Sequence, residues 1–529
     1  MTALPATQLV AELRAKLGAA QVITDAGQRE LVSTDFYSAG TPCTAIIRPV
    51  STAALAEAAA LVTGAGYALV PRGGGMSYTG GYTPTRAHTV MVDLGDMASV
   101  VAINPEDMTL TVQAGATWET VYDALKPHGL RVPFFGTFSG RLATVGGGLS
   151  NGAVFFGTAR YGCAADHALG LEVVCADGRV LRTGQAALEN GKAFYRTHGP
   201  DLTGLFLHDC GALGIKTEAS FRLIEMPKDN ESVSFALPDA KSAAAALSAV
   251  ARAGVAEDAY VFDPETTARN MDTGTLGSDL KRLGSIVTGQ GSTLAGLKAG
   301  AKAVSAGKKI VPEGAYSLHA VCAGRSEASV RADADRCRDV VGRCGGSEIP
   351  NSIPVAVRAA PFDNLNGVLG PDGERWAALN AKVTHSDAMT IIDGFAALVA
   401  RHQAELDAHG VTTSTLFIAM DTHAFSFEPV FHWPDRWLPP HKAVPDAKHL
   451  ASLTEPAANP KAAELVARLR AATIELFTEL GAASNQIGRT YPWRDNLEMG
   501  AGDLFDALKA HLDPQHMMNP GVLARRADD

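Results

Sequence analysis

The chain has 529 residues, of which 46% are hydrophobic, and its 46 basic and 56 acidic residues give a net charge of −10. This length exceeds what one hydrophobic core usually supports, so we expect a globular protein with at least two domains. The acidic balance, without any cluster of Lys and Arg, argues against nucleic acid or an anionic membrane as a partner and favours small molecules.

The cysteines and the N-terminal residues indicate the compartment. Seven cysteines are scattered and never spaced as C-x-x-C, so neither a disulfide framework nor a zinc knuckle is expected. Residues 1–18 predict an amphipathic helix without a signal-peptide pattern, and no run of eighteen apolar residues occurs. We therefore expect a soluble, cytoplasmic protein in a reducing environment.

Two glycine-rich loops dominate the first part of the chain. An Ala- and Leu-rich helix is predicted over residues 53–63, and a short strand over 68–70 leads into the first loop, residues 70–81. Its three consecutive glycines permit positive φ and bring backbone N–H groups close to an anion such as a pyrophosphate. One such loop is also compatible with an ordinary turn. A second loop at residues 144–152 favours one long ligand held by both.

Strands and helices alternate around these loops. Strands are predicted over residues 89–94 and 109–113, and a helix over 116–126. An Asp-Gly pair at residues 177–178, flanked by apolar strands, predicts a β-hairpin. Residues 212–217 predict a strand with a close glycine approach.

The sequence pattern changes after about Met226. From there alanine-rich helices are predicted to alternate with apolar strands, which indicates a second domain. A strand predicted over residues 415–420 runs into an aromatic stretch, residues 423–435, which could line a pocket. The polar, Pro-rich residues 438–460 predict a long loop that is functional or mobile.

Three common motifs are tested and disfavoured. Neither loop matches G-x-G-x-x-G, and no P-loop sequence occurs, so nicotinamide-binding and P-loop folds lack their signatures. Residues 148–152 match the G-x-S-x-G of α/β-hydrolases, but that motif requires a preceding strand and a following helix. Here glycines precede it, which disfavours a hydrolase.

A series of motifs carries a family resemblance. They are Pro-Arg-Gly-Gly-Gly at 71–75, Arg-Tyr-Gly at 160–162, Gly-Pro-Asp-Leu-Thr-Gly-Leu-Phe at 199–206, Gly-Ala-Leu-Gly-Ile-Lys-Thr at 211–217 and Asn-Pro-Gly at 519–521. In this order and spacing the chain resembles the flavoprotein family of vanillyl-alcohol oxidase and p-cresol methylhydroxylase (the PCMH type), which includes a branch of D-lactate and glycolate dehydrogenases.

The resemblance implies an α+β fold with FAD as the cofactor. A two-subdomain FAD-binding domain would occupy residues 1–225, a substrate or cap domain residues 226–470, and a C-terminal segment, residues 471–529, would pack back on the FAD domain. The first loop would hold the pyrophosphate and the second would lie along the flavin. The implied cofactor-binding residues are Pro71, Arg72, Gly73, Gly74, Gly75, Met76, Ser77, Thr144, Gly146, Gly147, Gly148, Ser150, Asn151, Gly157, Tyr161, Gly211, Gly214, Ile215 and Asn519.

Departures from the family pattern are also informative. Members that attach FAD through a first-loop histidine carry it directly after the glycines, where this chain has Met76, so that linkage is excluded. We expect noncovalent FAD, and attachment through a cap-domain histidine, His423 or His432, stays open. The metal-binding Gly-Asp-Gly-Asn-x-His run and the later Glu-His of the glycolate and lactate branch are both missing. No metal site is therefore predicted.

Candidate catalytic residues lie in the aromatic stretch and near the C-terminus. A flavin accepts a hydride, while the protein supplies a base and countercharge. We predict His432 as the base, with Glu428 on the same face of an extended strand. Arg489 offers a planar fork for a carboxylate or phenolate, with Tyr491 as its polar neighbour. A purely structural role for His432 or Arg489 stays open, because such residues often serve packing or ion pairing.

The sequence thus predicts an FAD-dependent oxidoreductase acting on a 2-hydroxy acid such as D-lactate or glycolate. One alternative is oxidation of 4-hydroxybenzylic alcohols. Another is an FAD-using synthase of the alkyl-dihydroxyacetone-phosphate synthase type, and a catalytically idle FAD-binding scaffold is the last. The expected partners are a small anionic or phenolic substrate and an electron acceptor, either O2, a cytochrome or a quinone. A homodimer is compatible with the sequence.

Overall fold

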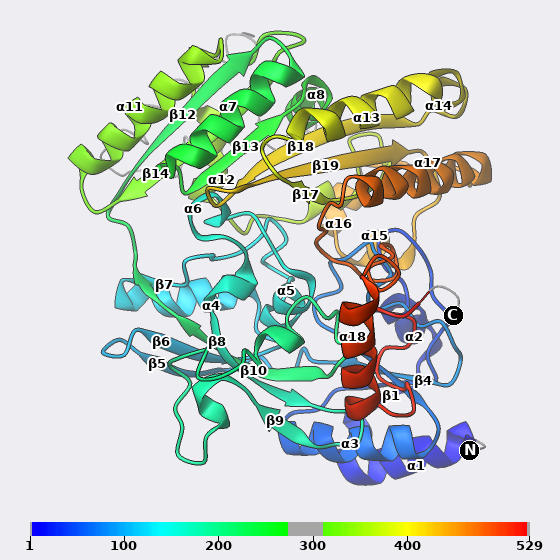
Figure 1. The fold of residues 1–529 in the computed structure, drawn as a ribbon. Coiled ribbons are helices and arrows are strands. Elements are labelled where there is room, and N and C mark those ends of the chain that lie inside the picture. The colour runs from blue at the N-terminus through cyan, green and yellow to red at the C-terminus, as the bar shows by residue number, and fades with distance from the viewer. Residues whose placement is uncertain (1–2, 273–309, 526–529) are drawn as a thin grey trace.

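The computed structural model describes residues 3–272 and 310–525, which form an N-terminal domain and a cap domain (Figure 1). In the view of Figure 1 the cap lies above the N-terminal domain, and the C-terminal helix α18 (Met499–Leu512) stands beside the lower domain. Both domains combine helices with sheets, so the predicted α+β class is confirmed. Among the described residues, no helix is both long and apolar enough to cross a membrane.

The first sheet of the N-terminal domain delivers the first glycine loop. Its strand order is β1-β2-β4-β3, and β2, β4 and β3 run parallel. The apolar side chains of β3 and β4 pack beneath α1 and α3 in one core, which explains why this part of the sequence is rich in Ala, Leu and Val. The elements are α1 (Ala6–Leu17), β1 (Val22–Ile23), α2 (Ala26–Val32), β2 (Ala45–Ile47), α3 (Thr52–Gly64), β3 (Ala68–Arg72) and β4 (Thr89–Asp93).

The second sheet of this domain is antiparallel, with the order β5-β6-β10-β8-β9. Strands β8 and β9 pair around Gly178, whose φ is +83°, so the predicted Asp-Gly hairpin is confirmed. The second glycine loop is not an open loop, because its residues form the short helix α5. The elements are β5 (Val100–Asn104), β6 (Thr109–Gln113), α4 (Trp118–Leu125), β7 (Leu130–Arg131), α5 (Val145–Asn151), α6 (Thr158–Tyr161), β8 (Ala168–Val174), β9 (Val180–Arg182), β10 (Ile215–Arg222) and β11 (Ile224–Glu225).

Eight strands of the described cap residues form one antiparallel sheet in the order β15-β12-β14-β13-β18-β19-β16, with β17 also paired to β19. The strands are β12 (Asp229–Leu237), β13 (Asp258–Phe262), β14 (Tyr316–Gly324), β15 (Ser347–Ile349), β16 (Arg375–Ala378), β17 (Ala381–Val383), β18 (Thr412–Met420) and β19 (Ala424–Trp433).

Helices α7, α11, α13 and α17 pack against this sheet and share one hydrophobic core with it. The cap helices are α7 (Ala240–Ala253), α8 (Pro264–Asp272), α11 (Glu327–Arg343), α12 (Ser352–Ala359), α13 (Ala388–Arg401), α14 (Gln403–His409), α15 (Pro439–Ala443), α16 (Ala447–Leu450) and α17 (Pro460–Glu479).

Strand β19 contains the aromatic stretch and shows why its residues divide into two sets. Phe425, Phe427 and Phe431 are fully buried in the core beneath the helices. Because successive side chains of a strand alternate between faces, Glu428 and His432 point to the opposite face. That face looks toward the N-terminal domain, so one strand supplies both core packing and site residues.

The end of the chain returns to the N-terminal domain. The backbone of Leu69 in β3 donates to the carbonyl of Met517 and accepts from the amide of Asn519. The expected boundary at residue 470 is not a structural one, because it falls inside α17, which packs on the cap helix α13 and on β19. The return to the N-terminal domain begins only after that helix.

Candidate functional site

One cavity of about 620 Å³ lies between the two domains and is lined by both glycine loops. Its other walls come from cap strands β13, β16, β18 and β19 and from residues 356–371. Ligand cavities commonly fall within this range of volumes. The predicted meeting of both loops at one ligand site is therefore what the fold produces.

The glycines of the first loop pack closely against the segment that leads into α5. A Cβ on Gly74 would lie 1.8 Å from the carbonyl oxygen of Leu142, and one on Gly73 would lie 2.2 Å from Oγ1 of Thr144. The buried carboxylate of Asp35, which the sequence analysis missed, accepts hydrogen bonds from the amides of Gly80 (2.7 Å), Tyr37 and Ser38. Burial raises the pKa of Asp35, and these donors oppose the rise. The loop is thus held in shape by the protein itself.

Helix α5 presents a second glycine cradle. Thr144 caps the helix by accepting a hydrogen bond from the amide of Gly147. A Cβ on Gly146 or Gly148 would lie 2.8 Å from Ala114 or Trp118, so those two glycines serve internal packing. A Cβ on Gly147 would meet only Oγ1 of Thr144, at 3.2 Å. Gly147 is therefore open toward the cavity and available for close approach by a ligand.

Most of the implied cofactor residues line this cavity. The lining ones are Pro71, Arg72, Gly73, Gly74, Gly75, Met76, Ser77, Thr144, Gly146, Gly147, Gly148, Ser150, Asn151, Gly211, Gly214 and Ile215. Two backbone cradles in one cavity, each excluding side chains, fit an elongated ligand with a pyrophosphate and a flat ring system. These residues therefore fit FAD.

Gly157, Tyr161 and Asn519 do not line the cavity, which corrects their expected role. The amide of Gly157 donates to Asp258 at 2.6 Å. The side chain of Asn519 is buried and donates to the carbonyls of Gly81 (2.8 Å) and Cys210 (2.7 Å). Asn519 thus ties the C-terminal segment to the first loop and to Cys210, which precedes the lining residue Gly211.

Arg489 also lies away from this cavity. Its guanidinium donates to the carbonyls of Gly80, Thr83 and Pro520 and to Oδ1 of Asn519. The planar fork is therefore directed at backbone oxygens of the first loop and the C-terminal segment. This geometry argues against the predicted substrate contact and favours a structural role for Arg489.

Glu428 and His432 face the cavity from β19, as their spacing predicts. Burial raises the pKa of Glu428 to about 7, although a hydrogen bond with Asn380 opposes the rise. Burial, and then the positive charge of Arg269, lower the pKa of His432 to about 3. His432 Nε2 lies 2.9 Å from Oγ of Ser414. Because a base works best with a pKa near the working pH, Glu428 is the better candidate.

Two tyrosines reach the cavity near Glu428. The hydroxyl of Tyr491 accepts a hydrogen bond from the amide of Asn380 at 2.7 Å. Tyr78, which the sequence analysis missed, packs against Trp376 with ring centroids 5.7 Å apart. Burial raises the pKa of both hydroxyls, whereas the buried guanidinium of Arg470 lowers them. Both hydroxyls are therefore neutral hydrogen-bonding groups near pH 7.

Two of the cations that line the cavity, Lys216 and Arg269, have acidic partners close by. Lys216 pairs with Asp209 at 2.5 Å, and both side chains are buried. Arg269 pairs with Glu265 at 2.8 Å and with Glu374. Of the two histidines considered for covalent attachment, His432 lines the cavity, whereas His423 is exposed and does not. Within the described residues, no group of three metal-ligating side chains occurs.

We predict that Gly147→Ala weakens FAD binding at least tenfold without destabilising the protein, because the added methyl group enters the ligand's approach path while alanine favours the helix by ~1 kcal/mol. Gly64→Ala in α3, which meets nothing within 4 Å, is the matched control. Gly74→Val should lose FAD altogether. Fluorescence titration of the FAD-free protein measures each affinity, and a parental Kd for Gly147→Ala would show that α5 does not approach the ligand.

We also predict that acid or heat releases the flavin, because Met76 stands where a linking histidine would be. The supernatant of the denatured protein should contain all of the FAD. Flavin that remains with the precipitate would instead indicate a covalent bond, and His432→Ala would then test the cap-domain linkage.

Comparison with known sequences agrees with this site. Residues 43–184 match the family described as FAD binding domain. D-lactate dehydrogenase [cytochrome] 1, mitochondrial, of Saccharomyces cerevisiae is 33% identical over 189 residues, or 35% of this chain and 31% of that protein. The glycolate oxidase subunit GlcD of Bacillus subtilis is 32% identical over 189 residues, or 36% and 38% of the two chains. The chain thus matches about a third of the length of these relatives.

Solved structures resemble the whole chain. p-Cresol methylhydroxylase with substrate bound has a TM-score of 0.73 at 18% identity, covering 99% of this chain and 97% of that one. 4-Ethylphenol oxidase from Gulosibacter chungangensis has a TM-score of 0.72 at 18% identity, covering 99% and 98%. An alkyldihydroxyacetonephosphate synthase has a TM-score of 0.67 at 16% identity, covering 98% and 87%.

The matched sequence segment contains the first glycine loop and α5, and the likeness of fold extends through the cap. The expected arrangement of an FAD domain and a cap domain is thereby confirmed. Residues 43–184 therefore form an FAD-binding domain, which makes FAD the cofactor, and the whole chain has the fold of p-cresol methylhydroxylase and 4-ethylphenol oxidase.

Proposed function

We propose that this protein oxidises a small substrate by hydride transfer from a carbon that bears, or is conjugated with, a hydroxyl group. The observation that carries this proposal is one cavity that runs from the FAD-binding loops to a buried carboxyl group on β19. Bound FAD supplies the hydride acceptor. The chain itself orients the substrate and takes up the hydroxyl proton.

Glu428 is the proposed proton acceptor. Its raised pKa, about 7, leaves a substantial fraction ionised at neutral pH while keeping the carboxylate basic enough to accept a proton. His432 stays neutral there and lies within hydrogen-bonding distance of Ser414, so we assign it a role in orienting the substrate.

A phenolic substrate is the class that the cap wall fits best. The hydroxyls of Tyr78 and Tyr491 offer hydrogen bonds to a phenol oxygen, with Arg470 behind them as a positive charge that favours phenolate. Trp376 contributes an aromatic surface. Two proteins that share the fold act on phenolic compounds by their names, p-cresol methylhydroxylase and 4-ethylphenol oxidase.

A 2-hydroxy acid is the second candidate. It is supported by the curated relatives, which include a D-lactate dehydrogenase, a glycolate oxidase subunit and a D-2-hydroxyglutarate dehydrogenase. On the cap side of this cavity the lining cation is Arg269, near His432, and Glu265 and Glu374 already balance its charge. That balance makes this class the weaker fit.

A panel of phenolic alcohols, alkylphenols, D-lactate, glycolate and D-2-hydroxyglutarate, added without oxygen, tests the proposal by loss of the visible flavin absorbance. We predict that a phenolic compound reduces the flavin. Tyr491→Phe should slow this reduction by ~10-fold or more, because the hydrogen bond between the Tyr491 hydroxyl and the phenol oxygen is lost. Tyr195→Phe, at an exposed site, is the control. Reduction by a hydroxy acid alone would favour the second candidate, and no reduction by any compound would favour a synthase or an idle scaffold.

We further predict that kcat/KM rises as the pH increases through about 7, since Glu428 must lose its proton before it can act as a base. Glu428→Gln should remove this pH dependence and lower the rate of flavin reduction by roughly 10²- to 10⁴-fold. Glu189→Gln, an exposed position, should leave the profile unchanged. A parental rate in Glu428→Gln would assign the proton acceptor to another group.

A further inference from the structure

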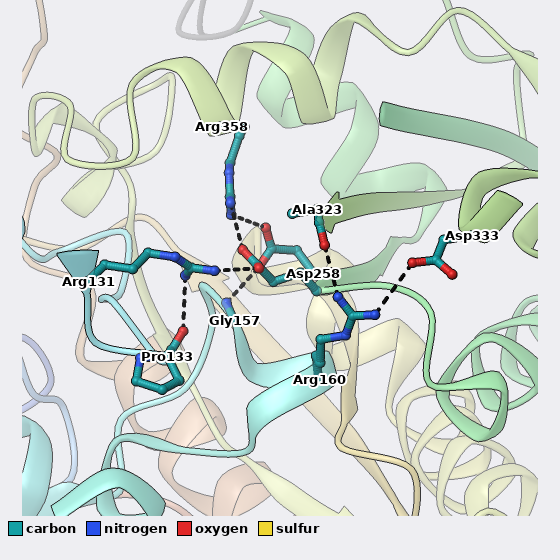
Figure 2. A network of polar contacts seen from close by, with 9 residues as sticks. Arg131, Pro133, Gly157, Arg160, Asp258, Ala323, Asp333 and Arg358 are labelled. Atoms are coloured by element: carbon teal, nitrogen blue, oxygen red, sulfur yellow. Dashed lines mark hydrogen bonds and ion pairs between the residues drawn. The ribbon is translucent and has the colours of Figure 1, made fainter. Parts of the chain in front are cut away.

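A buried network of ion pairs joins the two domains beside the cavity (Figure 2). The carboxylate of Glu257 accepts hydrogen bonds from Nη2 of Arg131 at 2.5 Å and from Nη2 of Arg358 at 2.6 Å. The carboxylate of Asp258 accepts from Nη1 of Arg358 at 2.9 Å and from the amide of Gly157 at 2.6 Å. Two guanidiniums thus balance two carboxylates, and Arg131, Glu257 and Asp258 are almost fully buried.

Three walls of the cavity begin at this network. Gly157 lies two residues after Phe155, which lines the cavity on the side of α5. Asp258 begins β13, which ends at another lining residue, Phe262. Arg358 lies in α12 between the lining residues Val357 and Ala360.

The backbone at Gly157 depends on its acceptor. Its φ is +89°, and a Cβ there would lie 2.3 Å from the carbonyl oxygen of Pro133, so the chain passes through a narrow space. Its amide points at Oδ1 of Asp258 (Figure 2). An unpaired buried amide is costly, so loss of this acceptor should release the segment that carries Phe155.

We propose that Asp258 is a positioning residue. It fixes the segment after α5, residues 152–160, relative to the cavity wall that α12 and the following residues form, residues 355–371. Oδ1 accepts a hydrogen bond from the amide of Gly157, in the segment after α5, and Oδ2 accepts one from Arg358, in α12. This inference rests on the proposed function for the purpose of the cavity, but it can be tested with bound FAD and no substrate.

Three variants separate the two contacts. Asp258→Ala removes both. Asp258→Asn keeps an oxygen that can accept from Gly157, but its neutral amide no longer balances Arg358. Arg358→Gln removes the ion pair between α12 and Asp258 and leaves the hydrogen bond between Gly157 and Asp258 in place.

Hydrogen–deuterium exchange of the FAD-bound protein reports each wall, and visible circular dichroism reports the surroundings of the flavin. In Asp258→Ala we expect at least tenfold faster exchange in residues 152–160 and 355–371, together with a changed flavin dichroism. In Asp258→Asn and Arg358→Gln only residues 355–371 should exchange faster, and the flavin signal should stay parental. Restoration of the flavin signal by Asn at position 258 is an effect that general destabilisation would not produce.

Arg160→Ala is the matched control, because Arg160 pairs with Asp333 at 3.4 Å across the same domain boundary at a partly exposed position. It should change neither the exchange of residues 355–371 nor the flavin dichroism. Equal effects of Asp258→Ala and Arg160→Ala, or uniformly faster exchange throughout the protein, would overturn the inference. If Asp258→Ala does not fold, parental exchange of residues 355–371 in both other variants would overturn it as well. Failure of every substrate to reduce the flavin would count against the proposed function alone.

Discussion

The paired carboxylates Glu257 and Asp258 impose the constraint on which the shape of the site depends. Moving charges out of water costs several kcal/mol per ion, so such groups are tolerated only when partners with good geometry surround them. Burial raises the pKa of Glu257, but Arg131 and Arg358 outweigh it, and the pKa ends below its usual value. At Asp258 burial prevails, and its pKa rises to about 6. If the domains moved apart at this point, Arg131 and Glu257 would separate and a buried charge would lose its partner.

The cap sheet keeps its hydrophobic core and its site residues on opposite faces. On β19 the phenylalanines pack under the helices, while Glu428 and His432 face the cavity. Burial in this water-poor site raises the pKa of Glu428 and lowers the pKa of His432. His432 is therefore neutral near pH 7, whereas Glu428 is partly ionised there and can exchange a proton with the substrate.

The C-terminal segment completes the FAD-binding loops from outside the cavity. Asn519 bridges the carbonyls of Gly81 and Cys210, and Arg489 links the first loop to the residues around Pro520. Backbone carbonyls buried at such a junction need donors, and these two side chains supply them. The Asn-Pro-Gly motif is thereby explained by support of the loops, without any direct contact with the cavity.

The sequence by itself determined the parts of this protein that neighbouring residues encode. The glycine loops, the Asp-Gly hairpin and the shared face of Glu428 and His432 follow from backbone freedom and strand periodicity, which are local properties. Only the tertiary structure decided that Arg489 serves backbone carbonyls, that Tyr78 faces the cavity, and that Glu428 suits a base better than His432. These outcomes depend on burial and on partners distant in sequence, such as Asp258 for Gly157, and no local pattern specifies them.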